Sequence, residues 1–238
     1  YIRDEKFSDK MKDFLLFKNL DGKYLTLSQC LEENKEAHEN TVFYVTDEKA
    51  QSQYINMFRE AGIDAVYLTH AIDSPFISHL EQKNEDVHFL RIDTDLDSTF
   101  KEEVKEEDQE AVQKMTEELT EVFRKALGND KLEVKAEKLK NPSIASVLTL
   151  SEEGRRMQDM MKMYNMGDAD LFGASETLVL NANHPLVAYV TEHKDGEDTP
   201  AFCEQLYDLA QLSHGSLSPE RMTKFIARTN ELMLKLAK

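Results

Sequence analysis

Residues 151–167 (SEEGRRMQDMMKMYNMG) repeat apolar positions at helical spacing between charged flanks. Positions i, i+3, i+4 and i+7 gather on one face of a helix, and here that face is almost wholly methionine. Methionine is unbranched and polarisable, and it recurs on surfaces that must fit several partners. The stretch is predicted to form an amphipathic helix whose apolar face either packs inside the fold or stays partly exposed to bind proteins. Its apolar positions are Met157, Met160, Met161, Met163 and Tyr164.

Upstream of this stretch, short β-branched and aromatic runs alternate with amphipathic segments. Residues 1–39 are expected to form two short helices joined by a turn at Asp21-Gly22. Asp47 is placed as the cap of a later helix that Gly62 ends, and Ser74-Pro75 opens another. Around these helices three buried strands are predicted, at residues 42–45, 65–68 and 87–92. Strands and helices that alternate with short links predict a small parallel sheet with right-handed crossovers.

Downstream of residue 92, an acidic run leads into one long helix with apolar positions from Phe100 to Ala126 and Gly128 at its end. Such a run is usually the solvated face of a helix, so we expect no metal site there. Strands are then predicted at residues 131–136, 146–150 and 176–181, and helices at residues 183–193, 200–212 and 219–237. The domain boundary is placed at the acidic run. The predicted fold is therefore a βαβαβ parallel-sheet subdomain in residues 1–98 and an α+β domain ending in a helix hairpin in residues 99–238.

The closing helix hairpin carries a continuous apolar stripe that must be covered by something. A self-complementary helix pair that closes with a twofold mate is a common solution. Burial of one such side chain contributes about 1.5–3 kcal/mol, and association costs roughly 4–15 kcal/mol. Burial of about half a dozen apolar side chains on each of two chains can therefore drive dimerisation. If the stripe packs within its own domain, the chain is a monomer. The residues assigned to a dimer interface are Phe202, Leu206, Leu209, Met222, Phe225, Ile226, Leu232, Met233 and Leu236.

Composition and charge narrow the functional classes. The chain has 238 residues, 40% of them hydrophobic, which is enough to build a core in one large or two small domains. Its formal charge of −17 repels phosphate backbones and disfavours binding of nucleic acid. No apolar run approaches the ~18 residues of a membrane span. Cys30 and Cys203 are expected to be reduced, buried thiols of a cytosolic protein. Since the first residue is Tyr1 and not Met, we expect a piece of a longer protein.

A search for catalytic chemistry finds no recognised site. The seven histidines are scattered, and none forms an HExxH pair or joins a CxxC motif, so no zinc site is predicted. No P-loop, GxGxxG or GxSxG motif is present. The loop after the first predicted strand, Thr46-Asp47-Glu48, is acidic and lacks glycine, whereas a phosphate site needs glycine-rich backbone amides. We therefore expect no catalytic residue, metal or cofactor in this chain, and a nucleotide-dependent enzyme built on the parallel sheet is the disfavoured alternative.

Five blocks of the sequence carry a resemblance to a known family. They are YLTLSQCLEENKEAHENTVFYVTDEK, AGIDAVYLTHAIDSPFISHL, NPSIASVLTLSEEGRRMQDMM, ETLVLNANHPLV and SPERMTKFIARTNELMLKLA. In order and spacing these blocks resemble bacterial members of the heat shock protein 90 family of chaperones, without large gaps. The resemblance implies that residues 1–98 are the end of a middle domain. It implies that residues 99–238 are a C-terminal dimerisation domain, whose last two helices form a four-helix bundle with the mate.

The same resemblance implies how the whole protein works. Members of the family are dimeric ATPases that close around unfolded or partly folded client proteins. Their ATP and Mg²⁺ site belongs to an N-terminal domain absent from this chain, so this portion is expected neither to bind nor to hydrolyse ATP. The chain ends at Lys238 without the acidic co-chaperone tail of eukaryotic cytosolic members or an ER-retention signal, which implies a bacterial cytoplasm. The competing interpretation is a dimeric scaffold or adaptor that does not bind unfolded proteins.

The resemblance also implies which residues contact clients. It places the methionine-rich face on an amphipathic helix that faces the dimer cleft, beside a predicted loop at residues 165–175. It adds a second surface on the middle domain, and there the chain departs from the family's pattern. Where bacterial relatives can carry a large aromatic, this chain has Pro75 followed by Phe76. The expected client-binding residues are Met157, Met160, Met161, Met163, Tyr164, Leu171, Phe172 and Phe76.

Overall fold

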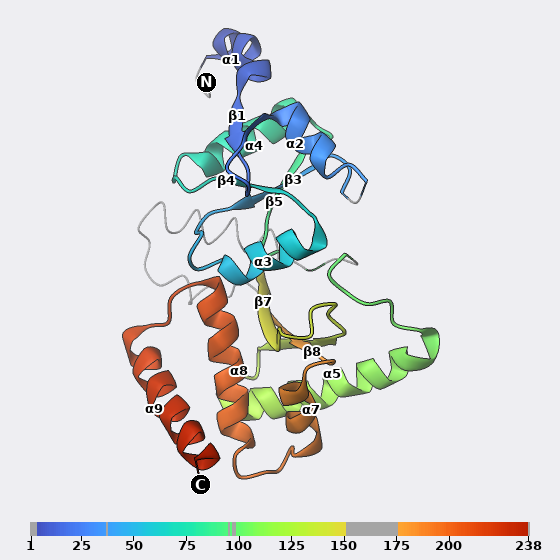
Figure 1. The fold of residues 1–238 in the computed structure, drawn as a ribbon, viewed down its shortest axis with the longest axis vertical. Helices are drawn as coiled ribbons and strands as arrows, with labels where there is room; N and C mark the ends of the chain where they lie inside the picture. The colour runs from blue at the N-terminus through green and yellow to red at the C-terminus, as the bar shows by residue number, and fades with distance from the viewer. Residues whose placement is uncertain (1–3, 37, 95, 97–98, 151–175, 238) are drawn as a thin grey trace. The chain divides into compact units, whose positions relative to one another are not determined.

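The computed structural model describes residues 4–36, 38–94, 96, 99–150 and 176–237. Within them the chain divides into two compact units, the first ending at Thr94 and the second comprising the remaining described residues (Figure 1). In the described part of the chain, no helix combines the length and the apolarity that crossing a bilayer requires. The predicted fold class, a two-part chain with a parallel sheet in its first part, is confirmed. The domain limits at residues 98 and 99 stay a prediction.

The first unit begins with elements that the sequence pattern only partly predicted. α1 (Glu5–Met11) leads through the 3-10 helix η1 (Lys12–Phe14) into β1 (Leu16–Lys18), which pairs antiparallel with β2 (Tyr24–Thr26). α2 (Leu27–Glu33) follows directly. The two predicted helices are therefore confirmed. The strands β1 and β2 were missed, because strands of three residues are too short to display the alternation by which a strand is predicted.

The centre of the first unit is a three-stranded parallel sheet. β3 (Thr41–Val45) lies between β4 (Ala65–Tyr67) and β5 (His88–Arg91), so the order is β4-β3-β5. α3 (Ser52–Ala61) connects β3 to β4, and α4 (Asp73–Lys83) connects β4 to β5. This confirms the predicted strand and helix alternation. Because the two crossovers lead to opposite sides of β3, right-handed connections place α3 and α4 on opposite faces of the sheet.

The side chains of β3 show which helix covers each face. The Phe43 ring lies 4.9 Å from the Phe58 ring of α3, measured between centroids. Val42 and Tyr44 point the other way, as alternation along a strand requires, and join a core built with α2, α4 and β1. Both faces are thus buried, which explains why the strand reads as one continuous apolar run in the sequence.

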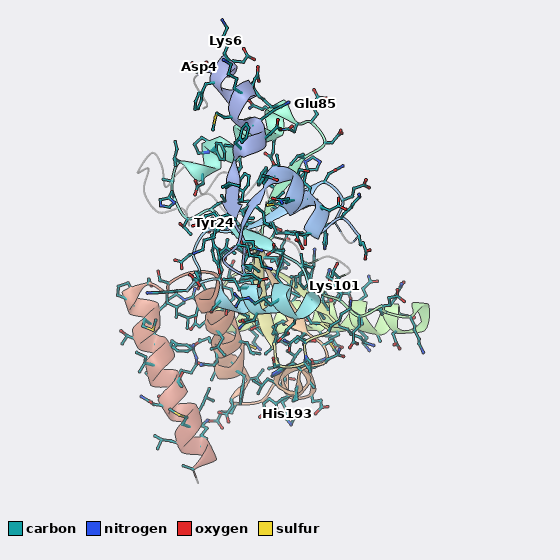
Figure 2. The ribbon with its side chains drawn as sticks, turned by 45° about the horizontal axis from the view of Figure 1, so that its top comes forward. Asp4, Lys6, Tyr24, Glu85, Lys101 and His193 are labelled. Carbon is teal, nitrogen blue, oxygen red and sulfur yellow. The ribbon has the colours of Figure 1, made fainter. Side chains whose placement is uncertain are left out.

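The second unit is built on a mixed sheet. β6 (Glu133–Glu137), β8 (Glu176–Asn181) and β7 (Ser146–Leu150) lie in the order β6-β8-β7, with β8 parallel to β6 and antiparallel to β7. The preceding helix, α5 (Glu106–Leu127), begins six residues later than its apolar pattern predicted. The segment before it is extended instead, and Lys101 (labelled in Figure 2) forms a β-bridge with Leu139.

Helices α5, α7 (Pro185–Glu192) and α8 (Thr199–His214) pack on one face of the mixed sheet around a single apolar core. α9 (Pro219–Leu236) then runs back along α8, on the side of α8 away from the sheet (Figure 1). The core side chains include Leu119, Phe123, Leu148, Leu178, Leu180, Val187, Val190, Cys203, Leu206 and Ala210. α9 contributes no residue to this core as far as the described residues show, so its apolar stripe needs a separate account.

Candidate functional site

The predicted client-binding residues fall into two groups, one in residues 157–172 and one on the first unit. Met157, Met160, Met161, Met163, Tyr164, Leu171 and Phe172 lie outside the described residues. The remaining one, Phe76, lies on α4 and is half-buried. Its ring centroid is 6.4 Å from that of Phe17, and its side chain packs against the core of the first unit. Part of the Phe76 ring therefore serves the fold, and its role in client binding stays a prediction.

The predicted dimer residues fall on α8 and α9, and α8 is fixed firmly to its own unit. Leu206 is buried in the core, and Phe202 packs against that core while remaining partly accessible. The hydroxyl of Ser146 on β7 donates to the Leu206 carbonyl at 2.8 Å. Leu209 is exposed. α8 thus uses Leu206 for its own fold and presents Leu209 to the outside.

α9 begins where the sequence predicted. The Oγ of Ser218 accepts a hydrogen bond from the Arg221 N–H at 3.3 Å, and Pro219 occupies the first helical position, where its missing N–H costs nothing. Residues 215–218 connect it to the end of α8. The connection is short, so α9 is held beside the α8 of its own chain.

One edge of α9 is bound to α8 by charged side chains. Three cations recur every seven residues along α9, close to two helical turns, so they lie along the same edge of the helix. Arg221 and Arg228 form ion pairs with acidic side chains of α8, and Lys235 forms one with the residue that precedes α8. We call this set the ion ladder. It consists of Arg221, Arg228 and Lys235 on α9, Glu204 and Asp208 on α8, and Asp198 directly before α8.

The centre of the ion ladder is buried. The side chains of Arg228 and Asp208 are only 8% and 4% exposed. Asp208 accepts from the guanidinium groups of both Arg228 and Arg221, the latter at 2.5 Å. Arg228 also donates to Glu204 Oε2 at 2.6 Å. Removing charges from water is costly, and these multiple charge-assisted hydrogen bonds offset that cost within the pair of helices.

The two ends of the ion ladder are more accessible. Arg221 lies with its guanidinium carbon 4.8 Å from the centroid of the Tyr207 ring, a cation–π contact. At the other end Lys235 binds Asp198, and this hydrogen bond raises the pKa of the Lys235 ammonium. Asp198 is the residue before α8, and its carboxylate serves Lys235 rather than capping its own helix. The ladder therefore ties α9 to α8 along most of its length.

The ion ladder has a sequence signal that the apolar pattern concealed. A stripe of apolar residues draws attention to the face of α9 that must be covered, and the cations beside it resemble an ordinary solvated edge. The sequence shows the seven-residue spacing of Arg221, Arg228 and Lys235. It also shows acidic residues in and directly before the preceding helix, at Asp198, Glu204 and Asp208. Interpreted as a pairing pattern between adjacent helices, it predicts the observed contacts.

The neighbouring edge of α9 is apolar and largely uncovered in the single chain. Ile226 and Met233, seven residues apart, are 53% and 54% exposed. Met222, Phe225 and Leu232 lie nearer α8 on the same stripe and are half-buried, and the side chain of Leu236 lies outside the described residues. Leu234, 63% exposed, lies about 100° around the helix from Met233 and off the stripe. The assignment of these residues to a dimer interface stays a prediction.

Reactive groups elsewhere in the described residues are few. Burial raises the pKa of both thiols, Cys30 and Cys203, to about 12, so at neutral pH they are protonated and poor nucleophiles. Over the described ranges, no group of three or more His, Cys, Asp and Glu side chains is arranged to hold a metal ion.

The loop after β3, where the sequence disfavours a phosphate site, has its amides already bonded. The side-chain oxygen of Gln51 accepts from the N–H groups of Thr46 and Asp47, at 2.8 and 3.1 Å. The carboxylate of Asp47 accepts from the N–H groups of Lys49 and Ala50, both at 3.0 Å. These bonds organise a turn, so α3 begins at residue 52 and not at residue 48 as predicted. Four amides that a phosphate could use are thus satisfied by the chain itself.

Comparison with known proteins places the chain in a family. The profile of a family described as Hsp90 protein matches residues 1–238. The chain is 29% identical over 221 residues to the chaperone protein HtpG of Porphyromonas gingivalis, covering 89% of this chain and 32% of the relative. It is 30% identical over 217 residues to the protein of that name from Shewanella amazonensis, covering 89% and 33%. The one from Bacteroides fragilis is 30% identical over 213 residues, covering 84% and 31%. The chain spans about a third of the length of these relatives.

Proposed function

Because the chain belongs to the Hsp90 family, we propose that it is the homodimerisation and client-binding portion of an ATP-dependent chaperone that assists unfolded or partly folded proteins. Its relatives in three bacteria are named as chaperones, which supports the class of activity and confirms the resemblance found in the sequence. On this proposal ATP and Mg²⁺ are handled by parts of the whole protein outside this chain, and the protein works in a bacterial cytoplasm.

The observation that carries the dimer is the exposed edge of α9. Ile226 and Met233 present an apolar surface on a helix whose neighbouring edge is tied down by the ion ladder. Covering one such side chain contributes about 1.5–3 kcal/mol. Each residue occurs twice in a twofold interface. The free energy gained by burying the stripe and Leu209 can therefore exceed the roughly 4–15 kcal/mol that association costs. A second copy of α9 offers a surface of the same chemistry.

The test replaces the exposed stripe without touching the ion ladder. We expect Ile226→Asp combined with Met233→Asp to raise the dimer dissociation constant at least about 30-fold, since residues at the centre of an interface commonly contribute 2 kcal/mol or more. Leu234→Asp is the matched control, because it makes the same change at a similarly exposed site off the stripe. The measurement is sedimentation velocity over a dilution series. A parent chain that is monomeric at micromolar concentration contradicts the dimer.

Client binding is assigned to the methionine-rich face at residues 157–164. Its support is the adaptability of methionine and the membership of a chaperone family. Met160→Asp with Met163→Asp is expected to abolish suppression of client aggregation, measured by light scattering of a heat-denatured protein, while the dimer dissociation constant stays unchanged. If suppression is retained, the face has no part in client binding. If no variant of the chain suppresses aggregation but all dimerise, the scaffold interpretation is favoured.

A further inference from the structure

One amide side chain of α8 contacts two consecutive residues of α9. The Oε1 of Gln205 accepts from Arg228 Nε at 2.9 Å, and its Nε2 donates to Thr229 Oγ1 at 3.1 Å. The hydroxyl of Thr229 is itself oriented, because it donates to the Phe225 carbonyl at 2.7 Å. Consecutive residues of a helix point about 100° apart. Both contacts can therefore form at only one rotation of α9 about its own axis.

The buried part of the ion ladder adds a second constraint on that rotation. Arg228 donates to both Glu204 and Asp208, and Asp208 also accepts from Arg221, two turns earlier on α9. A rotation of α9 would have to separate Asp208 from two guanidinium groups at once. Since Asp208 is almost wholly buried, its carboxylate would lose these partners before gaining water.

Apolar contacts alone would leave the rotation loosely defined. Phe225 and Leu232 are only half-buried beside α8, and Met222 and Met233 are flexible side chains that fit several arrangements. The stripe of α9 is also broad. A rotation by about 40°, the offset between positions i and i+4, still leaves apolar side chains against α8. The polar contacts, and not the apolar ones, select one arrangement.

We propose that Arg228, Gln205 and Asp208 are positioning residues for dimerisation. They set the rotation of α9, so that Ile226 and Met233 face the second copy and Leu234 does not. This inference rests on the proposed dimer, and it requires none of the three residues to touch the partner. Buried polar groups that specify one arrangement of helices, with little gain in stability, are well attested in coiled coils.

The experiment separates positioning from a simple loss of structure. Arg228→Met removes the guanidinium and keeps a long side chain. Gln205→Met removes only the two-ended amide and retains the ion pairs of Arg228. Lys224→Met is the matched control, because Lys224 is exposed and pairs with Glu220 within α9 itself. Each change is made in the whole chain carrying either Ile226→Cys or Leu234→Cys, and far-UV circular dichroism checks that the helices are retained.

Two quantities are measured, the dimer dissociation constant by sedimentation and the rate of maleimide labelling of the introduced thiol above and below that constant. In the otherwise unchanged chain we expect the thiol at position 226, and not the thiol at position 234, to be protected in the dimer. Arg228→Met is expected to weaken the dimer about tenfold and to remove the contrast between the two positions. Gln205→Met acts in the same direction with a smaller change, and Lys224→Met changes neither quantity.

The outcomes distinguish the two proposals. The reference is the chain that carries only Ile226→Cys or Leu234→Cys. If this chain dimerises weakly or not at all and protects neither position, the proposed dimer through α9 fails. If it protects position 226 and both variants keep the same affinity and the same contrast, the positioning role is overturned and the dimer stands. A weaker dimer that still protects only position 226 gives these residues a purely structural role and likewise overturns the inference. Should Arg228→Met not fold, Gln205→Met decides.

Discussion

α3 and α9 arise from the same kind of sequence pattern and have different surroundings. Each is an amphipathic helix with a well-defined apolar stripe. The apolar side chains of α3 (Tyr54, Ile55, Met57 and Phe58) are all buried. On α9, Ile226 and Met233 are more than half exposed, and the helix is tied to its own chain by ion pairs. An apolar stripe thus shows that a surface needs covering, but not which chain covers it.

The difference follows from the position of each helix in the chain. α3 connects two adjacent parallel strands, so the sheet it must cover is formed by the residues on either side of it. α9 lies on α8, whose own apolar side is already taken by the mixed sheet. Among the described residues, no sheet is left for α9 to cover. Its apolar stripe is available to a second copy.

The largest expected effect is the loss of stability on removing a buried side chain of α3. Phe58→Ala should lower the free energy of unfolding by about 3–5 kcal/mol, because it empties a buried site whose ring packs 4.9 Å from that of Phe43. The loss should be the same at every protein concentration, since the site lies inside one chain. Urea denaturation followed by circular dichroism at two concentrations measures it. A loss below about 1 kcal/mol would show that α3 is not a core helix.

A smaller loss of stability is expected from a substitution at Gly62, where α3 ends. Gly62, after α3, has a φ of +71°, and the following N–H, of Ile63, bonds to the Phe58 carbonyl at 2.9 Å. Gly62→Ala should cost roughly 1 kcal/mol, wholly through this left-handed backbone, because an added Cβ meets no atom within 4 Å. The same denaturation experiment measures it.

Gly215, after α8, is the control for that prediction. Its φ of −172° is extended backbone, and an added Cβ there also meets nothing within 4 Å. Gly215→Ala should change the free energy of unfolding by less than about 0.5 kcal/mol. Equal losses at the two glycines would mean that the backbone conformation after α3 carries no special cost.

Local chemistry made much of the fold predictable. Gly62 and Gly128 end helices with positive φ, as their position after an apolar stripe predicted, and Ser218 caps α9. The three parallel strands followed from their apolar runs. β1 and β2 were missed because each has only three residues, and α3 was begun too early because Gln51 reaches back to the loop after β3. That contact depends on side-chain geometry, which a pattern does not contain.

The candidate site was predictable in part. The stripe of α9 was identified from its spacing, whereas Leu206 was assigned to an interface although its side chain is buried in its own core. Spacing could not separate these cases, since both helices place apolar residues at regular intervals. The ion ladder depends on two helices being read together. Gln205, which links two consecutive residues of α9, has no signal in the sequence at all.

The smallest effect on the single chain gives the sharpest test of the comparison. Met233→Ala should change the stability of the monomer by less than about 0.5 kcal/mol, because more than half of this side chain is already exposed. Above the dimer dissociation constant the same substitution should lower the melting temperature further, since an interface that binds only the folded chain stabilises it by mass action. Calorimetry on either side of that constant measures both shifts. Phe58→Ala, in the core of the first unit, should shift the melting temperature equally at both concentrations. If Met233→Ala also gave equal shifts, the stripe of α9 would not be covered by a second chain, and the distinction between the two helices would be lost.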